Sequence, residues 1–438
     1  MLENVNEIPL PLNEYSFIQD RNYIKSLDRT NTILESNARE KVVMIYFEKL
    51  KQNEFKRKDL SGFNPSKPIE QTLNSIVNSQ MYAELKHVPK GGNLHVHEDQ
   101  SFNRRKLLEK IKANEEYDYL YICDKKSNVN CKITNVCNCT ENFLTFIKNP
   151  SDAKENGWVK VKNSPKWTID EILNKTTLIG ILNNLDKKIS PTDSSSRWRI
   201  TDERRFFEIY SDLLAYNKTR FDYLKSFLDD ALEENVQLIE FRRFNFNGLY
   251  YFDDRGNRIY LPINDEIDRI LKFRNEFSHE NPTFIDFSYI LNGPRKSSQQ
   301  DIQLDLDLAI QTHKHYPSLI KGYDLVNEED QGHSLLFHSK ALINGFKYSL
   351  LTQASTSNGS FNYYFHNGET NWPSDMMPSQ FEDDRFVSNN IYDALVFNTR
   401  RIGHGLAYIK HPNLYGVLRE RNIAIEICPA SNQILGFF

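Results

Sequence analysis

Apolar segments of strand length alternate with amphipathic segments of helix length through the second half of the chain, and this alternation restricts the fold most. After Trp198, a helical pattern through Phe221 and Leu228 leads to an apolar strand at 236–241. Further strands are predicted at 283–291, 319–326, 362–366, 401–404 and 423–428, with helices between them at 301–315, 334–351, 387–398 and 414–421. Such alternation is typical of parallel βα units, so the predicted fold class is α/β.

A further strand, 92–97, precedes this series, and residues 14–87 before it follow a helical pattern with amphipathic runs at 31–55 and 71–85. With this strand the sequence predicts seven parallel strands. A closed (β/α)8 barrel needs one strand more. The alternation suits a barrel or an open doubly wound sheet. The predicted organisation is a helical region at 1–87 that forms an appendage or a dimerisation arm, the first strand at 88–103, an insert at 104–165 and the rest of the strand–helix series at 166–438.

The insert is rich in Lys and Asn and carries the short strand 119–122 and four of the five cysteines, Cys123, Cys131, Cys137 and Cys139. Cysteines this crowded without C-x-x-C pairs favour disulfides in a small subdomain. N-x-S/T triplets at 138, 174, 217 and 358 suit glycosylation in the secretory pathway. The first residues lack the basic and apolar regions of a signal peptide, so an intracellular role stays open.

Charge and hydropathy exclude two broad classes. The net charge of −4 and a pI near 6.3 argue against a nucleic-acid binder. No run of 18 apolar residues occurs, so no membrane span is predicted.

Histidines gather at the predicted strand ends. His95 and His97 share one face of their strand because side chains alternate with a period of two. His366 ends another strand, with Glu369 three residues later, and His404 lies between glycines at the end of the next. Each histidine alone fits a core or capping role equally well. Together, at the carboxyl ends of parallel strands, they predict a metal site for hydrolysis.

The sequence then resembles the adenosine deaminase family, and within it the secreted adenosine deaminase-related growth factors. The resemblance covers about residues 80–438, and the matching stretches, in order, are 89–97 (PKGGNLHVH), 322–326 (GYDLV), 330–335 (DQGHSL), 365–372 (FHNGETNW), 401–407 (RIGHGLA) and 427–433 (ICPASNQ). The family also has N-terminal dimerisation helices and a disulfide-bearing insert. The resemblance thus implies a TIM-type (β/α)8 barrel, here without its eighth strand.

The resemblance further implies zinc-dependent deamination of adenosine or 2′-deoxyadenosine to the inosine product. His95, His97 and His366 would bind the Zn²⁺ ion, which lowers the pKa of a bound water. Glu369 would protonate N1 of the purine, and His404 would orient or deprotonate the water. Substrate contacts are expected from Glu98, Asp99, Trp198, Asn327 and Trp372. Expected partners beyond the nucleoside are a second copy of the chain and a cell-surface receptor or glycosaminoglycan.

Several positions depart from the family pattern. Asn367 replaces an alanine beside the third histidine, and Asn327 replaces a glycine; Glu98 intervenes before Asp99, and Pro294-Arg295 stands for a His-Arg pair. The family's eighth strand ends in an aspartate that binds zinc, and the sequence stops before it. We therefore expect the chain as it stands to be weakly active or inactive.

Two other functions stay open: a non-catalytic secreted growth factor or receptor ligand on the same scaffold, and a different zinc hydrolase. Cytidine-type deamination is disfavoured because Cys137-Asn138-Cys139 lacks the P-C-x-x-C spacing.

Overall fold

The structure is a computed structural model, and it describes residues 18–19, 37–56, 74–98, 101, 103–123, 144–149, 158–162, 164–176, 210, 212–244, 246, 248–327, 329–330, 332–353, 359–370 and 389–434. The chain divides into two compact units, Met1–Leu85 and Lys86–Phe438. Each unit is described separately below.

The first unit is helical where it is described. Helix α2 spans Ala38–Lys56, and a short helical turn at 74–77 precedes α4, Gln80–Lys86. The helix predicted at 71–85 is interrupted at Ser79, because the Ser79 hydroxyl accepts a hydrogen bond from the backbone N–H of Tyr82 at 3.0 Å. A serine that caps the following turn in this way starts a new helix.

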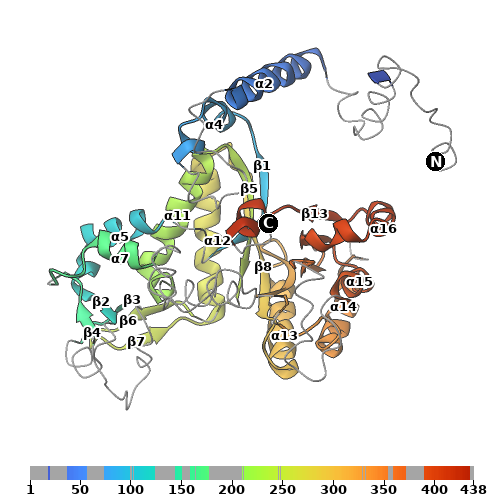
Figure 1. Cartoon of the computed structure of the whole chain (residues 1–438). Helices are drawn as coiled ribbons and strands as arrows, with labels where there is room; N and C mark the ends of the chain where they lie inside the picture. The colour runs from blue at the N-terminus through green and yellow to red at the C-terminus, as the bar shows by residue number, and fades with distance from the viewer. Residues whose placement is uncertain are drawn as a thin grey trace, which may run out of the picture. The chain divides into compact units, whose positions relative to one another are not determined.

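The second unit is built on a parallel sheet, as the α/β prediction requires. Its first part has the order β1-β5-β8-β9-β10. These strands span Gly91–His97, Val236–Arg243, Asp286–Pro294, Ile320–Val326 and Asn362–Tyr363, respectively. All neighbouring pairs are parallel, and Figure 1 shows β1, β5 and β8 next to one another.

The sheet continues through a second part, β11-β12-β13, with bounds His366–Asn367, Arg401–His404 and Ala424–Glu426. Strands β10 and β11 are two halves of the segment predicted as a single strand at 362–366. That segment lies between β9 and β12: the N–H of Tyr364 donates to the carbonyl of Tyr323 on β9 at 3.0 Å, and the N–H of Gly403 on β12 donates to the carbonyl of Phe365 at 2.8 Å. The seven predicted strand positions therefore follow one another in chain order.

Helices pack on one face of this sheet. They are α11, Asn217–Glu233; α12, Ile263–Glu280; α13, Gln299–His315; α14, Ser339–Gln353; α15, Asn390–Val396; and α16, Leu414–Glu420. Helix α13 packs against both β8 and β9, and α14 packs against β10. The strand side chains that face these helices, among them Val96, Phe241 and Tyr289, are buried in one large apolar core. The opposite face of the strands carries most of the polar side chains.

The predicted insert forms a three-stranded antiparallel sheet in the order β3-β2-β4, with bounds Leu144–Phe146, Leu120–Cys123 and Trp158–Lys160. In the chain, helix α5, Arg104–Ala113, precedes these strands and helix α7, Ile169–Thr176, follows them. The two helices contact each other. Leu108, Leu120 and Phe146 belong to the same apolar core as the central sheet. The remaining three clustered cysteines and the side chain of Cys123 lie outside the described residues.

Several predicted boundaries differ from the structure, among them the starts of α14 and β8. Helix α14 begins at Ser339 instead of 334, because residues 335–338 form turns that bury His338. Strand β8 begins at Asp286 instead of 283 and extends to Pro294. None of the described helices combines the length and apolar character that a membrane crossing requires.

Candidate metal and catalytic site

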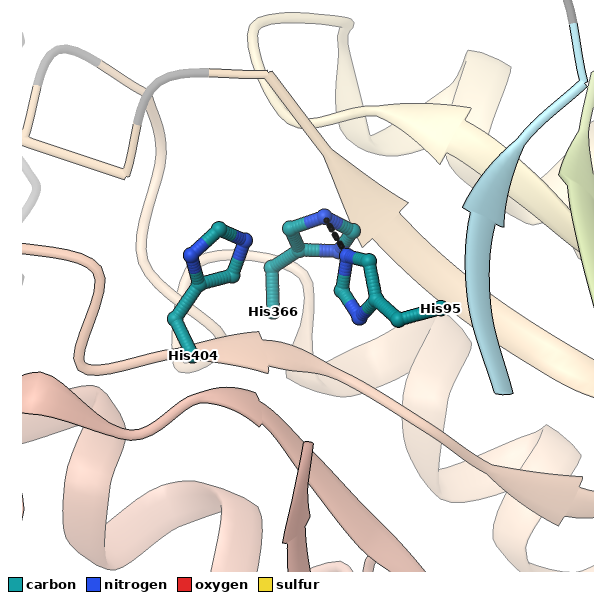
Figure 2. A group of neighbouring side chains, drawn as sticks. All are labelled: His95, His366 and His404. Atoms are coloured by element: carbon teal, nitrogen blue, oxygen red, sulfur yellow. Dashed lines mark hydrogen bonds between the residues drawn. The ribbon is translucent and has the colours of Figure 1, made fainter. Parts of the chain in front are cut away.

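Four histidines from three strand segments converge at the carboxyl end of the sheet. His95 and His97 project from β1 on the face opposite Val96, which is part of the apolar core. His366 begins β11, and His404 ends β12. Figure 2 shows His95, His366 and His404 around one point. The structure therefore brings together all four histidines that the sequence singled out.

The imidazoles are close enough to share one cation. Nε2 of His366 lies 3.1 Å from Nε2 of His95 and 3.0 Å from Nε2 of His97. One ligand atom each from His95, His366 and His404 falls within 4.8 Å of the others. The His404 ring lies 5.1 Å from the His95 ring and 5.2 Å from the His366 ring, measured between centroids.

Strand β12 comes this close because of a glycine. A Cβ atom at Gly403 would lie 2.9 Å from Cε1 of His95 and 3.3 Å from Cα of His366. Contacts that short force a neighbour to move, and here the neighbours are an imidazole of the cluster and a strand backbone.

Two carboxylates hold the outer nitrogens of this cluster. Nδ1 of His95 donates to Oε2 of Glu426 at 2.7 Å, and Nδ1 of His366 donates to Oδ2 of Asp324 at 2.7 Å. Arg242 lies between the two carboxylates: Nε donates to Asp324 at 3.0 Å and Nη2 to Glu426 at 2.5 Å. All three side chains are buried. Carboxylates in this position fix the orientation of metal-binding imidazoles and make them stronger ligands.

These contacts decide where the ring protons lie. A carboxylate accepts, so the single proton of neutral His95 and of neutral His366 sits on Nδ1. Both Nε2 atoms then carry lone pairs and face each other at 3.1 Å. Burial holds the pKa of His95 and of His366 well below the usual range, and Arg242 lowers both further. Because a proton between the rings is disfavoured, a metal cation is what fits the converging lone pairs.

His404 and Glu369 form a second, catalytic-type pair beside the cluster. Nε2 of His404 lies 3.4 Å from Oε1 of Glu369. Nδ1 of His404 donates to the side-chain oxygen of Asn432 at 2.7 Å, which leaves Nε2 with its lone pair toward Glu369. Burial, followed by the charge of His366, lowers the pKa of His404 to about 3. His404 also adopts a left-handed backbone conformation, with φ of 65°, which is uncommon for residues other than glycine.

Glu98 does not face the cluster. Since side chains alternate along β1, Glu98 lies on the side of the helices, where it is 1% exposed. One oxygen accepts from Tyr289 at 2.8 Å and pairs with Arg220, and the other accepts from Arg243 at 3.1 Å. Because both oxygens are engaged, the expected substrate contact by Glu98 is replaced in the structure by a buried ion-pair network.

Asn327 follows β9 with φ of 79°, a conformation that asparagine tolerates better than most residues. The Asn367 side chain accepts a hydrogen bond from the Tyr408 hydroxyl at 2.9 Å, on the side of the strand opposite His366. Asn367 therefore does not crowd the imidazoles. Asp99, Trp198 and Trp372 lie outside the described residues.

The sequence-based prediction missed Arg242, Asp324, Glu426 and Asn432. Arg242 and Asp324 alternate with buried apolar neighbours in their strands, Phe241 before Arg242 and Tyr323 and Leu325 around Asp324, and this alternation was the available signal. The partners of these four residues described above are 28 to 331 residues away in sequence, so the contacts themselves carry no local signature.

The chain is similar in sequence to known proteins. The family model described as "Adenosine deaminase" matches residues 383–438. An adenosine deaminase of Phlebotomus duboscqi is 29% identical over 408 residues, covering 91% of this chain and 69% of the relative. Adenosine deaminase 2-A of Danio rerio is 27% identical over 423 residues, covering 93% of this chain and 73% of the relative. An adenine deaminase structure from Arthrobacter aurescens aligns with a TM-score of 0.43 and 14% identity over 80% of this chain and 74% of that chain, a likeness on which we base no argument.

A parallel α/β sheet with buried, carboxylate-oriented imidazoles at its carboxyl end defines a metal-dependent hydrolase type of site. Residues 383–438 match the adenosine deaminase family model, and the relatives named adenosine deaminase support the same assignment for this chain as an enzyme of that type. The resemblance seen in the sequence is confirmed.

Proposed function

We propose that this enzyme catalyses the zinc-dependent hydrolytic deamination of adenosine or 2′-deoxyadenosine. The observation that carries the proposal is the convergence of four imidazoles, two of them buried, next to Glu369 at the carboxyl end of the sheet. His95, His97 and His366 are the proposed zinc ligands. When bound at such a site, zinc lowers the pKa of a water molecule to near 7.

The chain's own residues supply the proton transfers. His404 accepts a proton from the attacking water at Nε2, which the hydrogen bond from Nδ1 to Asn432 keeps unprotonated. Glu369 donates a proton to N1 of the purine, so that C6 accepts the oxygen of water. The amino nitrogen then takes the proton held by His404, the C6–N bond breaks and ammonia leaves, while the remaining hydroxyl proton on C6 passes to Glu369 as the carbonyl forms. Asn327, Asp99, Trp198 and Trp372 are the proposed substrate contacts.

The test combines metal content with the loss of adenosine absorbance. We expect zinc to co-purify with the chain, and adenosine to be converted to inosine by a chain extended through the eighth strand that the resemblance implies. Glu369→Gln removes the proton donor and should lower kcat by about two to four orders of magnitude. Glu420→Gln is the matched control, because Glu420 is exposed on α16. Zinc binding without any response to adenosine would support a different zinc hydrolase instead.

The proposal also covers the barrel, the dimer, the insert and secretion. We propose that the curved sheet belongs to a TIM-type barrel, since His95 on the first strand contacts Glu426 on β13 at 2.7 Å. Residues 1–87 are proposed to mediate a homodimer, and 104–165 to form the disulfide-bearing insert. The N-x-S/T triplets and clustered cysteines support secretion and glycosylation in the growth-factor branch. Glycosidase treatment and light scattering of the secreted product test these points.

As a member of the growth-factor branch, the protein is also proposed to bind a cell-surface receptor or a glycosaminoglycan. Its proposed role is extracellular purine signalling. Binding to heparin resin at physiological salt tests the glycosaminoglycan directly. Retention that persists after Glu369→Gln would separate this binding from catalysis.

A further inference from the structure

A buried carboxylate outside the imidazole cluster contacts the backbone of Glu369. Glu329 lies in the loop after β9 and is 1% exposed. Its Oε2 accepts a hydrogen bond from the backbone N–H of Glu369 at 2.7 Å. Buried carboxylates are costly to desolvate, so one that is retained here needs strong hydrogen bonds to offset that cost.

The second oxygen of Glu329 is held as firmly as the first. Oε1 accepts from the side-chain amide of Asn390, at the start of α15, at 2.9 Å. The side-chain oxygen of Asn390 in turn accepts from the backbone N–H of Leu335 at 2.8 Å. Glu329 and Asn390 thus connect the loop after β9, the loop after β11, the turn at 332–338 and helix α15. We refer to Glu329 and Asn390 as the carboxylate–amide clamp.

The carbonyl end of the same peptide group, between Gly368 and Glu369, is also fixed. Gly368 adopts φ of 72°, which favours glycine, and its carbonyl accepts from the N–H of Ala407 at 3.0 Å. The peptide that precedes Glu369 is therefore held at its carbonyl by Ala407, in the 3-10 helix after β12, and at its N–H by Glu329. An N–H bonded to a carboxylate is held more strongly than one bonded to a neutral carbonyl.

We propose that Glu329 is a positioning residue that sets the Glu369 carboxyl at its working distance from His404 and the purine N1. The inference rests on the proposed role of Glu369 in deamination. A displacement of about 1 Å in a reacting group costs on the order of 100-fold in rate. The clamp acts on the backbone of Glu369, so it affects the chemical step without contacting substrate or metal.

The hydrogen-bond pattern of the clamp allows an exchange test. Glu329→Gln keeps an oxygen for the Glu369 N–H but turns an amide N–H₂ toward the N–H₂ of Asn390, so two donors face each other. Asn390→Asp alone places two carboxylates against each other. The double variant, Glu329→Gln with Asn390→Asp, restores one donor and one acceptor at every contact.

We expect each single variant to lower kcat by about 10- to 100-fold, with KM and zinc content unchanged. The double variant should recover kcat to within about threefold of the wild type, because contacting residues are not additive. Glu420→Gln serves again as the exposed control. Single variants with wild-type kcat, or a double variant no faster than either single one although it unfolds at the wild-type midpoint, would overturn the proposal.

Hydrogen exchange of peptides that cover residues 366–370 gives a readout that does not depend on turnover or metal. We expect faster exchange at the Glu369 amide in Glu329→Gln and wild-type protection in the double variant. Equal protection in wild type and Glu329→Gln would overturn the inference about Glu329. A chain extended through the eighth strand that the resemblance implies would instead overturn the proposed function if it bound zinc but converted no adenosine, so the two failures are distinguishable.

Discussion

Arg242 connects the two carboxylates that orient the imidazoles, and it has no exposed surface. Removing one partner of such a buried network leaves uncompensated charge, which costs about 3–5 kcal/mol. We expect Arg242→Met to lower the free energy of unfolding by that amount. We also expect it to weaken metal binding by about 10- to 100-fold, since Asp324 and Glu426 lose their fixed positions. Denaturant titration and metal competition measure the two effects.

Arg419→Met is the control for this change, because Arg419 is exposed on α16. Its effect on the free energy of unfolding should stay within about 0.5 kcal/mol. Unchanged metal affinity in Arg242→Met would contradict the bridging role.

The buried histidines also predict how stability depends on pH. Burial lowers the pKa of His95, His97, His366 and His404, the last to about 3, whereas the unfolded chain titrates them near 6.5. Below pH 6.5 the unfolded state therefore binds more protons than the folded state. Stability that is present above pH 6.5 is then lost as the pH falls, by up to about 1.4 kcal/mol per pH unit for each histidine.

This pH effect is measured on the metal-free chain as the urea midpoint between pH 7 and pH 5. In His404→Gln the stability should fall less steeply as the pH falls, by up to about 1.4 kcal/mol per pH unit, the contribution of one histidine. A slope of zero between these pH values would show that the histidines are protonated in the folded state.

Among the elements, β12 depends on a residue without a side chain. We expect Gly403→Ala to push β12 away from His95 and to weaken metal binding at least tenfold, because the added Cβ has no room. Gly416→Ala makes the same change in α16, where nothing lies within 4 Å of the added atom. Gly416→Ala should stabilise the helix by about 0.5–1 kcal/mol and leave metal affinity unchanged. Isothermal titration with zinc checks both variants.

The helices and strands could be predicted where the sequence has a clear hydrophobic periodicity. The alternation of strands and helices predicted the parallel α/β sheet, and β12 has the predicted bounds, 401–404. The segment at 362–366 was predicted as one strand but is divided between β10 and β11, because its backbone pairs first with β9 and then with β12. Such a change of partner is a tertiary effect that local sequence does not encode.

The candidate site was predictable where strand ends carry chemistry and not where distant residues orient it. His95, His97, His366, His404 and Glu369 were visible from their positions alone. Glu98 was expected to contact substrate, although the period of two that places His97 inward places Glu98 on the helix side. Asp324 and Glu426 became visible only once β9 and β13 had been brought beside the histidines.

For the whole molecule, a bound metal should contribute to folding stability. A ligand present at 100 times its dissociation constant stabilises the folded state by about 2.7 kcal/mol. We expect a chelator to lower the Tm of the metal-loaded chain, and readdition of zinc to restore it. In His366→Ala, which lacks the central imidazole, the chelator should leave Tm unchanged; an equal drop in both proteins would place the metal elsewhere.

The pairing of His95 with Glu426 joins residues 331 positions apart. Translation at about 5–20 residues per second separates the synthesis of the two by tens of seconds. Through that interval the nascent chain carries a histidine pair whose orienting carboxylate has not yet been made. Metal capture with native geometry is therefore a late event, and a ribosome that stalls before β13 releases a polypeptide with unpaired strand edges and an incomplete ligand set, a suitable substrate for chaperones and proteases.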